Sequence, residues 1–174
     1  LVSRRGFAGY WEYRIDDALF TAPPRTDHSG AGLFNGRGEL VGIGSLVVAD
    51  TRTDPPADGP RIPGNMFVPI DLLPPILGVL RTQGMSSASR RAWLGVNCVE
   101  QRGAVHVVRI ADGSPAEAAG LRVGDRILAI DGSAVATLDA LWTRLWSGGP
   151  PEREVTLEID RDGTRQTVAL RSID

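Results

Sequence analysis

The chain has 174 residues, 42% of them hydrophobic and 23% charged, and its formal net charge is −2. This composition is typical of a globular chain long enough for one large domain or two small ones. The small negative charge gives no electrostatic reason to expect a nucleic acid or an anionic membrane as partner. A single cysteine and only two histidines exclude an internal disulfide and argue against a metal cluster, so we expect no metal and no cofactor. No apolar run reaches the roughly 20 residues of a transmembrane helix, so we expect no membrane insertion.

Two segments of the first half have the composition of strands. Residues 7–20 are aromatic and apolar, which favours strands. We expect the clustered aromatics of this segment, Tyr10, Trp11 and Tyr13, to be core residues rather than a ligand platform. Residues 40–48 are apolar and β-branched and predict a second, clearer strand.

A serine lies between these two segments in a run of small residues. The run 28–35 reads His-Ser-Gly-Ala-Gly-Leu-Phe-Asn, with Ser29 at its second position. Small residues around a serine let backbone N–H groups converge where Cβ atoms would otherwise crowd them. An acyl-transfer enzyme needs this arrangement of a nucleophile beside oxyanion donors. The alternative is an ordinary serine in a glycine-rich hairpin.

The middle of the chain predicts a loop, a helix and a linker. Residues 51–61 form a polar, proline-rich loop. Apolar residues at 72, 73, 76, 77 and 80 predict a helix that ends at Gly84. The polar stretch that follows indicates a domain boundary, so we expect one domain at 1–84, a linker at 85–90 and a second domain at 91–174.

The second half alternates short strands with two helices. Ser114 is followed by Pro, Ala and Glu, the order of an N-cap, a first-turn proline and an N3 glutamate. Thr137 caps a second helix that carries apolar residues at 138, 141, 142 and 145. A closing hairpin turns at Asp162-Gly163.

The serine run resembles the second β-barrel of trypsin-like serine proteases of the HtrA/Deg type. That family has a G-N-S-G-G-x-L-x-N pattern followed by G-E-L-x-G-I, and residues 28–35 and 38–43 match it without a gap. The resemblance implies that Ser29 is the nucleophile and that the N–H groups of Ser29 and Asp27 occupy the oxyanion-hole positions. It also implies that Ser45, Leu46 and Val47 pair with the substrate backbone. Because a β-branched Val47 would narrow the pocket, we expect small or medium aliphatic residues at the cleavage position.

The second half resembles a PDZ domain of the bacterial, protease-associated type. The run 114–132 carries the pattern S-P-A-x-x-A-G-L-x-x-G-D-x-I-L-x-I-D-G in full. The resemblance implies that Trp93, Leu94, Gly95 and Val96 form the carboxylate-binding loop, in which the last three offer N–H groups to a peptide C-terminus.

In such a domain the peptide lies along the strand after this loop by β-augmentation. The resemblance makes Leu138, Leu141 and Trp142 candidates to line the groove. Ordinary helix-to-sheet core packing is the alternative for each of them, and we expect Leu141 and Leu145 in the core.

The expected fold is therefore mainly β: half of a trypsin-like double barrel, as one antiparallel six-stranded barrel, followed by a PDZ domain with two helices. The resemblance implies a periplasmic or cell-envelope serine endopeptidase that hydrolyses unfolded or misfolded proteins, binds peptide C-termini and forms a homo-oligomer. The family's base histidine and aspartate come from the first barrel, so we expect this chain alone to be inactive. His28 cannot replace them, since adjacent residues of an extended segment point in opposite directions.

Two alternatives stay open. A pseudoprotease that binds peptides is supported by Asp27 and His28, which stand where the family usually has glycine and Asn or Asp. A PDZ adaptor fused to a structural β domain is the other.

Overall fold

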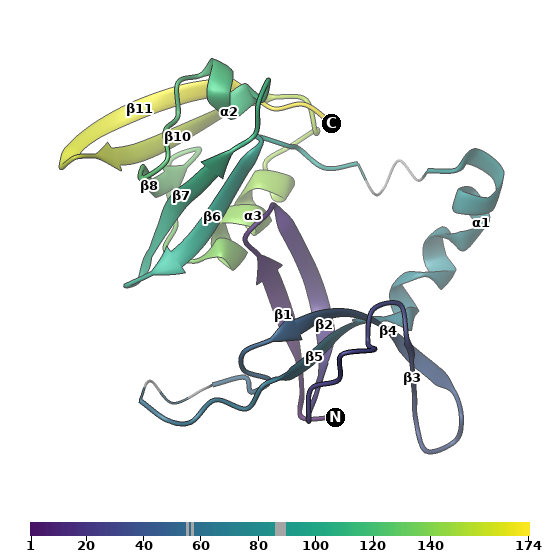
Figure 1. Ribbon diagram of the computed structural model, residues 1–174. Coiled ribbons are helices and arrows are strands. Elements are labelled where there is room, and N and C mark those ends of the chain that lie inside the picture. Colours follow the sequence, from purple (N-terminus) through teal and green to yellow (C-terminus); the bar gives the residue numbers. More distant parts are fainter. Residues whose placement is uncertain (55, 57, 86–89) are drawn as a thin grey trace. The chain divides into compact units, whose positions relative to one another are not determined.

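The computed structural model describes residues 1–54, 56, 58–85 and 90–174, so most of the predicted linker at 85–90 lies outside the described residues. The chain divides into two compact units. The first comprises Leu1–Phe7 and Ile15–Ser86, and the second comprises Ala8–Arg14 and Ser87–Asp174. Each unit is built on one β-sheet (Figure 1), which confirms the mainly β fold class.

The first unit contains a single five-stranded sheet in the order β1-β2-β5-β4-β3. The pairs β2–β5, β5–β4 and β4–β3 are antiparallel. Its buried residues include Ala18, Leu19, Phe20 and Met66. The strands are β1 (Ser3–Gly9), β2 (Tyr13–Thr21), β3 (Gly32–Phe34), β4 (Leu40–Val48) and β5 (Gly64–Pro69).

This sheet has one strand fewer than the six-stranded barrel expected from the sequence. Within the described residues, the long connection between β4 and β5 contributes no strand to the sheet. Prolines recur along this connection, and a proline has no N–H to donate to a ladder. β4 itself has the predicted bounds, 40–48.

The predicted helix follows β5. A short 3-10 turn, η1 (Ile70–Leu72), leads into α1 (Pro74–Gln83), whose two prolines occupy the first turn, where their missing N–H groups cost nothing. Gly84 ends α1 in the left-handed conformation with φ of 73°, as predicted. Among the described residues, no helix has both the length and the apolar character to cross a membrane.

The second unit contains a six-stranded sheet and two helices. The sheet has the order β11-β10-β8-β7-β6, with β9 paired to β8, so β6 is an edge strand. Its strands are β6 (Val96–Gln101), β7 (Ala104–Ile110), β8 (Arg126–Ile130), β9 (Ser133–Ala134), β10 (Glu154–Arg161) and β11 (Thr164–Arg171), and its helices are α2 (Pro115–Ala118) and α3 (Leu138–Ser147).

The local signals of this half are confirmed. The Ser114 side chain accepts a hydrogen bond from the Glu117 N–H, and Thr137 accepts one from the Ala140 N–H at 3.1 Å. Asp162 and Gly163 both have positive φ, as a tight hairpin turn requires. α3 packs its apolar face into the core of this unit through Leu138, Leu141, Trp142 and Leu145.

The expectation that Tyr10, Trp11 and Tyr13 are core residues is wrong, although Phe20 of the same segment is buried. The segment is a hairpin whose turn falls at Tyr10, Trp11 and Glu12. Tyr10 is 51% exposed. The Trp11 ring stacks on the Tyr13 ring, with 5.2 Å between the ring centroids. The turn residues themselves include no glycine or proline, which is why the sequence pattern concealed the turn.

Cys98, in β6, lies in the core of the second unit and is fully buried. Burial and, to a smaller extent, the negative charge of Glu12 raise the pKa of the Cys98 thiol to about 12. Because the thiolate is the nucleophile, we predict that the folded chain reacts with a disulfide reagent at pH 8 about a thousandfold more slowly than an ordinary thiol. Absorbance of the released thiol measures this rate. Urea-unfolded chain is the control, and equal rates with and without urea would contradict the prediction.

Candidate functional site

Ser29 lies on an exposed tight turn between β2 and β3. The Ala31 N–H closes this turn by donating to the His28 carbonyl at 2.9 Å, and Gly30 has a φ of 74°. The turn is fastened to β4 because the Gly30 N–H donates to the Gly44 carbonyl at 2.9 Å. The serine hydroxyl is therefore presented on a short, backbone-anchored bend.

Gly44 permits this close approach, and the sequence analysis did not single it out. A Cβ atom at residue 44 would lie 1.8 Å from the His28 carbonyl oxygen. The Gly44 N–H also donates to the Ala31 carbonyl at 2.8 Å. Any side chain at residue 44 would therefore push the serine turn away from β4.

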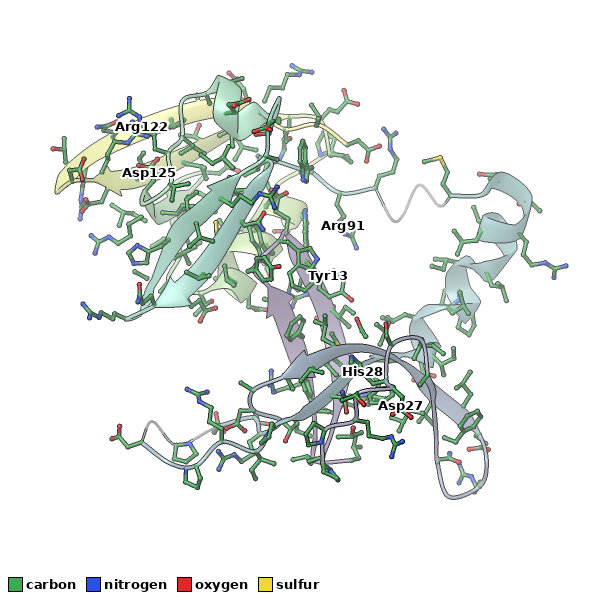
Figure 2. The ribbon with its side chains drawn as sticks, viewed as in Figure 1. Tyr13, Asp27, His28, Arg91, Arg122 and Asp125 are labelled. Atoms are coloured by element: carbon green, nitrogen blue, oxygen red, sulfur yellow. The ribbon has the colours of Figure 1, made fainter. Side chains whose placement is uncertain are left out.

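The loop before Ser29 is held by Asn65, which the sequence analysis also missed. The Asn65 side chain accepts from the Arg25 N–H at 2.7 Å and donates to the Arg25 carbonyl at 3.0 Å. Nδ1 of His28 is 2.9 Å from the same carbonyl. Figure 2 shows Asp27 and His28 together on this loop.

The carboxylate of Asp27 is engaged locally. It forms an ion pair with Arg25 at 2.8 Å. The Arg25 hydrogen bond and the residue's own backbone N–H both lower the pKa of Asp27. Asp27 has a negative φ, since the non-glycine residues with positive φ in the described part of the chain lie elsewhere. The Asp27 N–H, one of the two predicted oxyanion donors, thus interacts with its own side chain.

Among the described residues, no imidazole is hydrogen-bonded to the Ser29 hydroxyl. Of the chain's two histidines, His28 is adjacent to the serine and uses Nδ1 on the Arg25 carbonyl, while His106 lies in β7 of the other unit. A serine hydroxyl without a base is a weak nucleophile near neutral pH. No group of three or more metal-ligating side chains is found in the described residues.

The predicted substrate-pairing residues follow Gly44 directly on β4. The β4–β5 register shifts between Gly44 and Leu46, which places Ser45 in an irregularity of the ladder. Val47 is 58% exposed, whereas Ser45 and Leu46 are half-buried. Because Gly44 anchors the serine turn, this stretch of β4 and Ser29 are held close together.

The predicted carboxylate-binding loop is the best defined feature of the second unit. Trp93 exchanges two backbone hydrogen bonds with Ile173, at 2.7 and 3.1 Å. The Leu94 carbonyl accepts from the Ala116 N–H at 2.9 Å, which ties the loop to α2. Gly95 has a φ of 83°, and a Cβ there would lie 2.2 Å from the Cβ of Ser114. The loop therefore requires glycine at residue 95.

Three N–H groups of this loop converge on the carboxylate of Glu12. The N–H groups of Leu94, Gly95 and Val96 approach its oxygens at 3.0, 2.7 and 2.8 Å. These are the same three groups that the sequence assigned to a peptide carboxylate. Burial raises the pKa of Glu12, and the three backbone hydrogen bonds oppose that shift. The loop thus forms an anion-binding nest of backbone amides.

The helix residues predicted to line the groove are buried. Leu138 and Trp142 lie in the core of the second unit together with Leu141 and Leu145. Nε1 of Trp142 donates to the Gly9 carbonyl at 2.9 Å. The exposure of Trp142 is therefore limited by the Ala8–Arg14 segment of the same unit.

A buried ion pair fixes the loop before β8. Asp125 is 1% exposed and accepts from the Arg122 N–H at 2.8 Å and from two Arg161 nitrogens at 2.7 Å. Figure 2 labels Arg122 and Asp125. Burial raises the pKa of Asp125, but the hydrogen bonds of Arg161 and Arg122 outweigh it, so the pKa is lowered overall. We assign this group a structural role.

Comparisons with known proteins agree with the family resemblance predicted for each half of the chain. Residues 92–171 match the PDZ domain family. The chain is 33% identical over 163 residues to a probable periplasmic serine endoprotease, DegP-like, of Pseudomonas fluorescens, and 31% identical over 156 residues to that of Hahella chejuensis. These alignments cover 85% and 82% of this chain but 31% of each relative, so the chain spans less than a third of the relatives' length.

Solved structures of the same type share the fold. The serine endoprotease from Yersinia pestis has a TM-score of 0.51 and 22% identity, over 91% of this chain and 53% of that one. The HtrA-type protease AlgW with tripeptide has a TM-score of 0.52 and 19% identity, over 90% of this chain and 53% of that one. The second half of the chain thus matches the PDZ domain family and follows a β domain. The matches confirm the predicted resemblance to HtrA/Deg-type serine proteases with a PDZ domain.

We predict that Gly95→Ala disrupts the carboxylate-binding loop. The substitution meets both a left-handed backbone, which costs a non-glycine residue roughly 1–3 kcal/mol, and the Ser114 side chain. Gly103→Ala is the matched control, since Gly103 has a φ of 71° but open space around it. Urea unfolding of the two variants and the parent chain measures the cost. Equal destabilisation by the two substitutions would show that the Ser114 contact is unimportant.

Proposed function

We propose that this chain is part of a serine endopeptidase of the HtrA/Deg type that cleaves unfolded or misfolded proteins, with Ser29 as its nucleophile. The observation that carries the proposal is the similarity to DegP-like endoproteases, which runs through both halves of the chain. The exposed, backbone-anchored turn at Ser29 supports the assignment. We keep the domain bounds 1–84 and 91–174, with the linker at 85–90, as part of the proposal.

In this function the Ser29 Oγ attacks the scissile carbonyl and its proton passes to an imidazole. His28 is unsuited to that role because its ring is turned to the Arg25 carbonyl, and among the described residues no hydrogen bond joins its imidazole to the Ser29 hydroxyl. We therefore propose that the base histidine and its orienting aspartate belong to residues outside this chain, and that the 174 residues alone do not hydrolyse peptides. The much greater length of the relatives supports this view.

The developing oxyanion would be stabilised by the N–H groups of Ser29 and Asp27. Asp27 must then release its N–H from its own carboxylate, which Arg25 can hold aside through their ion pair. Substrate backbone would pair with Ser45, Leu46 and Val47 of β4. The exposed, β-branched side chain of Val47 favours small or medium aliphatic residues at the cleavage position.

The PDZ domain would recruit substrates by their C-termini, through Trp93, Leu94, Gly95 and Val96 and along the groove bordered by Leu138 and Trp142. The nest of three N–H groups supports capture of a carboxylate. We propose a periplasmic location, supported by the relatives, which are named periplasmic.

The test of the catalytic assignment is labelling with a fluorophosphonate probe in the protein extended by the sequence upstream of Leu1. We predict labelling that Ser29→Ala abolishes and that Ser133→Ala, a matched change in the PDZ domain, leaves intact. The 174-residue chain should remain unlabelled, because no base faces its serine. Mass spectrometry of the labelled peptide identifies the residue.

Labelling that persists in Ser29→Ala would refute the assignment of Ser29 as the nucleophile. An extended protein that is folded but never labelled would favour a peptide-binding pseudoprotease instead.

We also propose that the chain self-associates through the first unit. An apolar hollow of about 350 Å³ is lined by residues that include Ile43, Leu72 and Leu73, all of them at least partly exposed. Exposed apolar surfaces of this kind promote association. We predict concentration-dependent dimers in sedimentation velocity, weakened at least tenfold by Leu72→Asp.

Leu77→Asp is the matched control for this prediction, since Leu77 is 42% exposed, close to the 45% of Leu72, but does not line the hollow. A parent chain that stays monomeric at high concentration would overturn the proposal. So would equal weakening by the two substitutions.

A further inference from the structure

The peptide groove of the PDZ domain is occupied by the chain's own segment Ala8–Arg14. This segment belongs to the same compact unit as the PDZ domain, and its tip lies beside β6 and α3 (Figure 1). We propose that Ala8–Arg14 is an internal ligand, with Glu12 standing in for a peptide C-terminus, and that external peptides bind only by displacing it. The inference rests on the proposed peptide-binding function of the groove.

The Glu12 side chain supplies the anchor. Its carboxylate accepts hydrogen bonds from the N–H groups of Leu94, Gly95 and Val96, with the shortest N···O distance being 2.7 Å. Hydrogen bonds to an ionised acceptor are roughly twice as strong as neutral ones. A peptide's terminal carboxylate would need the same three donors, so the two carboxylates exclude each other.

The backbone of the segment supplies the second contact. The Cys98 N–H donates to the Tyr10 carbonyl at 2.7 Å. β6 is the edge strand of its sheet, and an edge strand is where an added peptide strand pairs. The segment therefore uses a donor of β6 that an incoming peptide would need for β-augmentation.

The helix side of the groove holds the segment as well. Nε1 of Trp142 donates to the Gly9 carbonyl at 2.9 Å in a buried hydrogen bond. Arg14 forms an ion pair with Asp139 of α3 at 2.7 Å. Contacts from the carboxylate loop, β6 and α3 thus surround one short stretch of chain, as they would surround a bound peptide.

The turn itself is costly to build with a glutamate. Tyr10, Trp11 and Glu12 form a three-residue hairpin loop, and Glu12 has a left-handed φ of 52°. Such loops favour glycine at the left-handed position, because other residues are strained there. The strained turn directs the Glu12 carboxylate at three backbone amides. A strained residue of this kind points to a function for its side chain.

An occupied groove lowers the apparent affinity for external peptides by the fraction of molecules in which it is free. Weakening the internal ligand should therefore strengthen external binding. Glu12→Gln keeps the size of the side chain but removes the charge that the nest favours. We expect peptides to bind Glu12→Gln about tenfold more tightly, in line with the loss of charged hydrogen bonds.

The experiment uses the 174-residue chain and a pool of ten-residue peptides randomised at the last three positions. The best binder of each protein is selected, labelled with fluorescein and titrated by fluorescence polarisation. Its C-terminally amidated form tests the need for a free carboxylate. Glu158→Gln is the matched control, since Glu158 is exposed on β10, which does not pair with β6.

Tighter binding by Glu12→Gln, with parent affinity for Glu158→Gln, would support the inference. Equal affinities for all three proteins would overturn it and leave peptide binding intact. Failure of every protein to bind any carboxylate peptide would overturn the proposed binding function instead.

Amide hydrogen exchange tests, independently of peptide binding, whether Glu12 occupies the carboxylate-binding loop. The N–H groups of Leu94, Gly95 and Val96 should exchange at least tenfold faster in Glu12→Gln, while the Val135 amide, bonded to the Leu128 carbonyl, stays unchanged. Unchanged exchange at all four amides would overturn the internal ligand whatever the peptides do.

Discussion

The second half of this chain depends on the convergence of three backbone N–H groups, those of Leu94, Gly95 and Val96. Peptide N–H groups along an extended chain normally alternate in direction, and the left-handed φ of Gly95 brings them to one side. This position must be a glycine, because a Cβ at Gly95 would collide with Ser114. Ser114 is in turn fixed as the N-cap of α2. The cap, the glycine and the nest are thus one structural unit.

The first half depends on a similar constraint at a different place. The serine turn can reach β4 only because Gly44 leaves room for the His28 carbonyl. Two backbone hydrogen bonds, from Gly30 to Gly44 and from Gly44 to Ala31, then hold the turn. A reactive hydroxyl needs this rigidity, since catalytic geometry tolerates little displacement. In both halves, glycine allows backbone polar groups to approach more closely than side chains would permit.

Sequence reasoning succeeded wherever a local rule determined the structure. The caps at Ser114 and Thr137 and the end of α1 at Gly84 follow from side-chain chemistry within a few residues. It failed where distant residues decide. The hairpin turn at Tyr10–Glu12 has no glycine or proline within it, and nothing local links a glutamate to amides more than 80 positions away. The clamp from Asn65 to the loop before Ser29 spans 40 positions and was concealed in the same way.

The two candidate sites share a feature: in each, at least one backbone N–H that is assigned to a ligand already faces a carboxylate of the same chain. Glu12 is enclosed, and its burial raises its pKa despite three hydrogen bonds. Asp27 is exposed, and Arg25 and its own N–H lower its pKa. The difference matters for displacement. Water and Arg25 can keep the Asp27 carboxylate solvated when it leaves its N–H, so a substrate oxygen meets weak competition. Glu12 gives up three charge-assisted hydrogen bonds at once, so the PDZ loop is the site where the chain's own carboxylate competes strongly with a ligand.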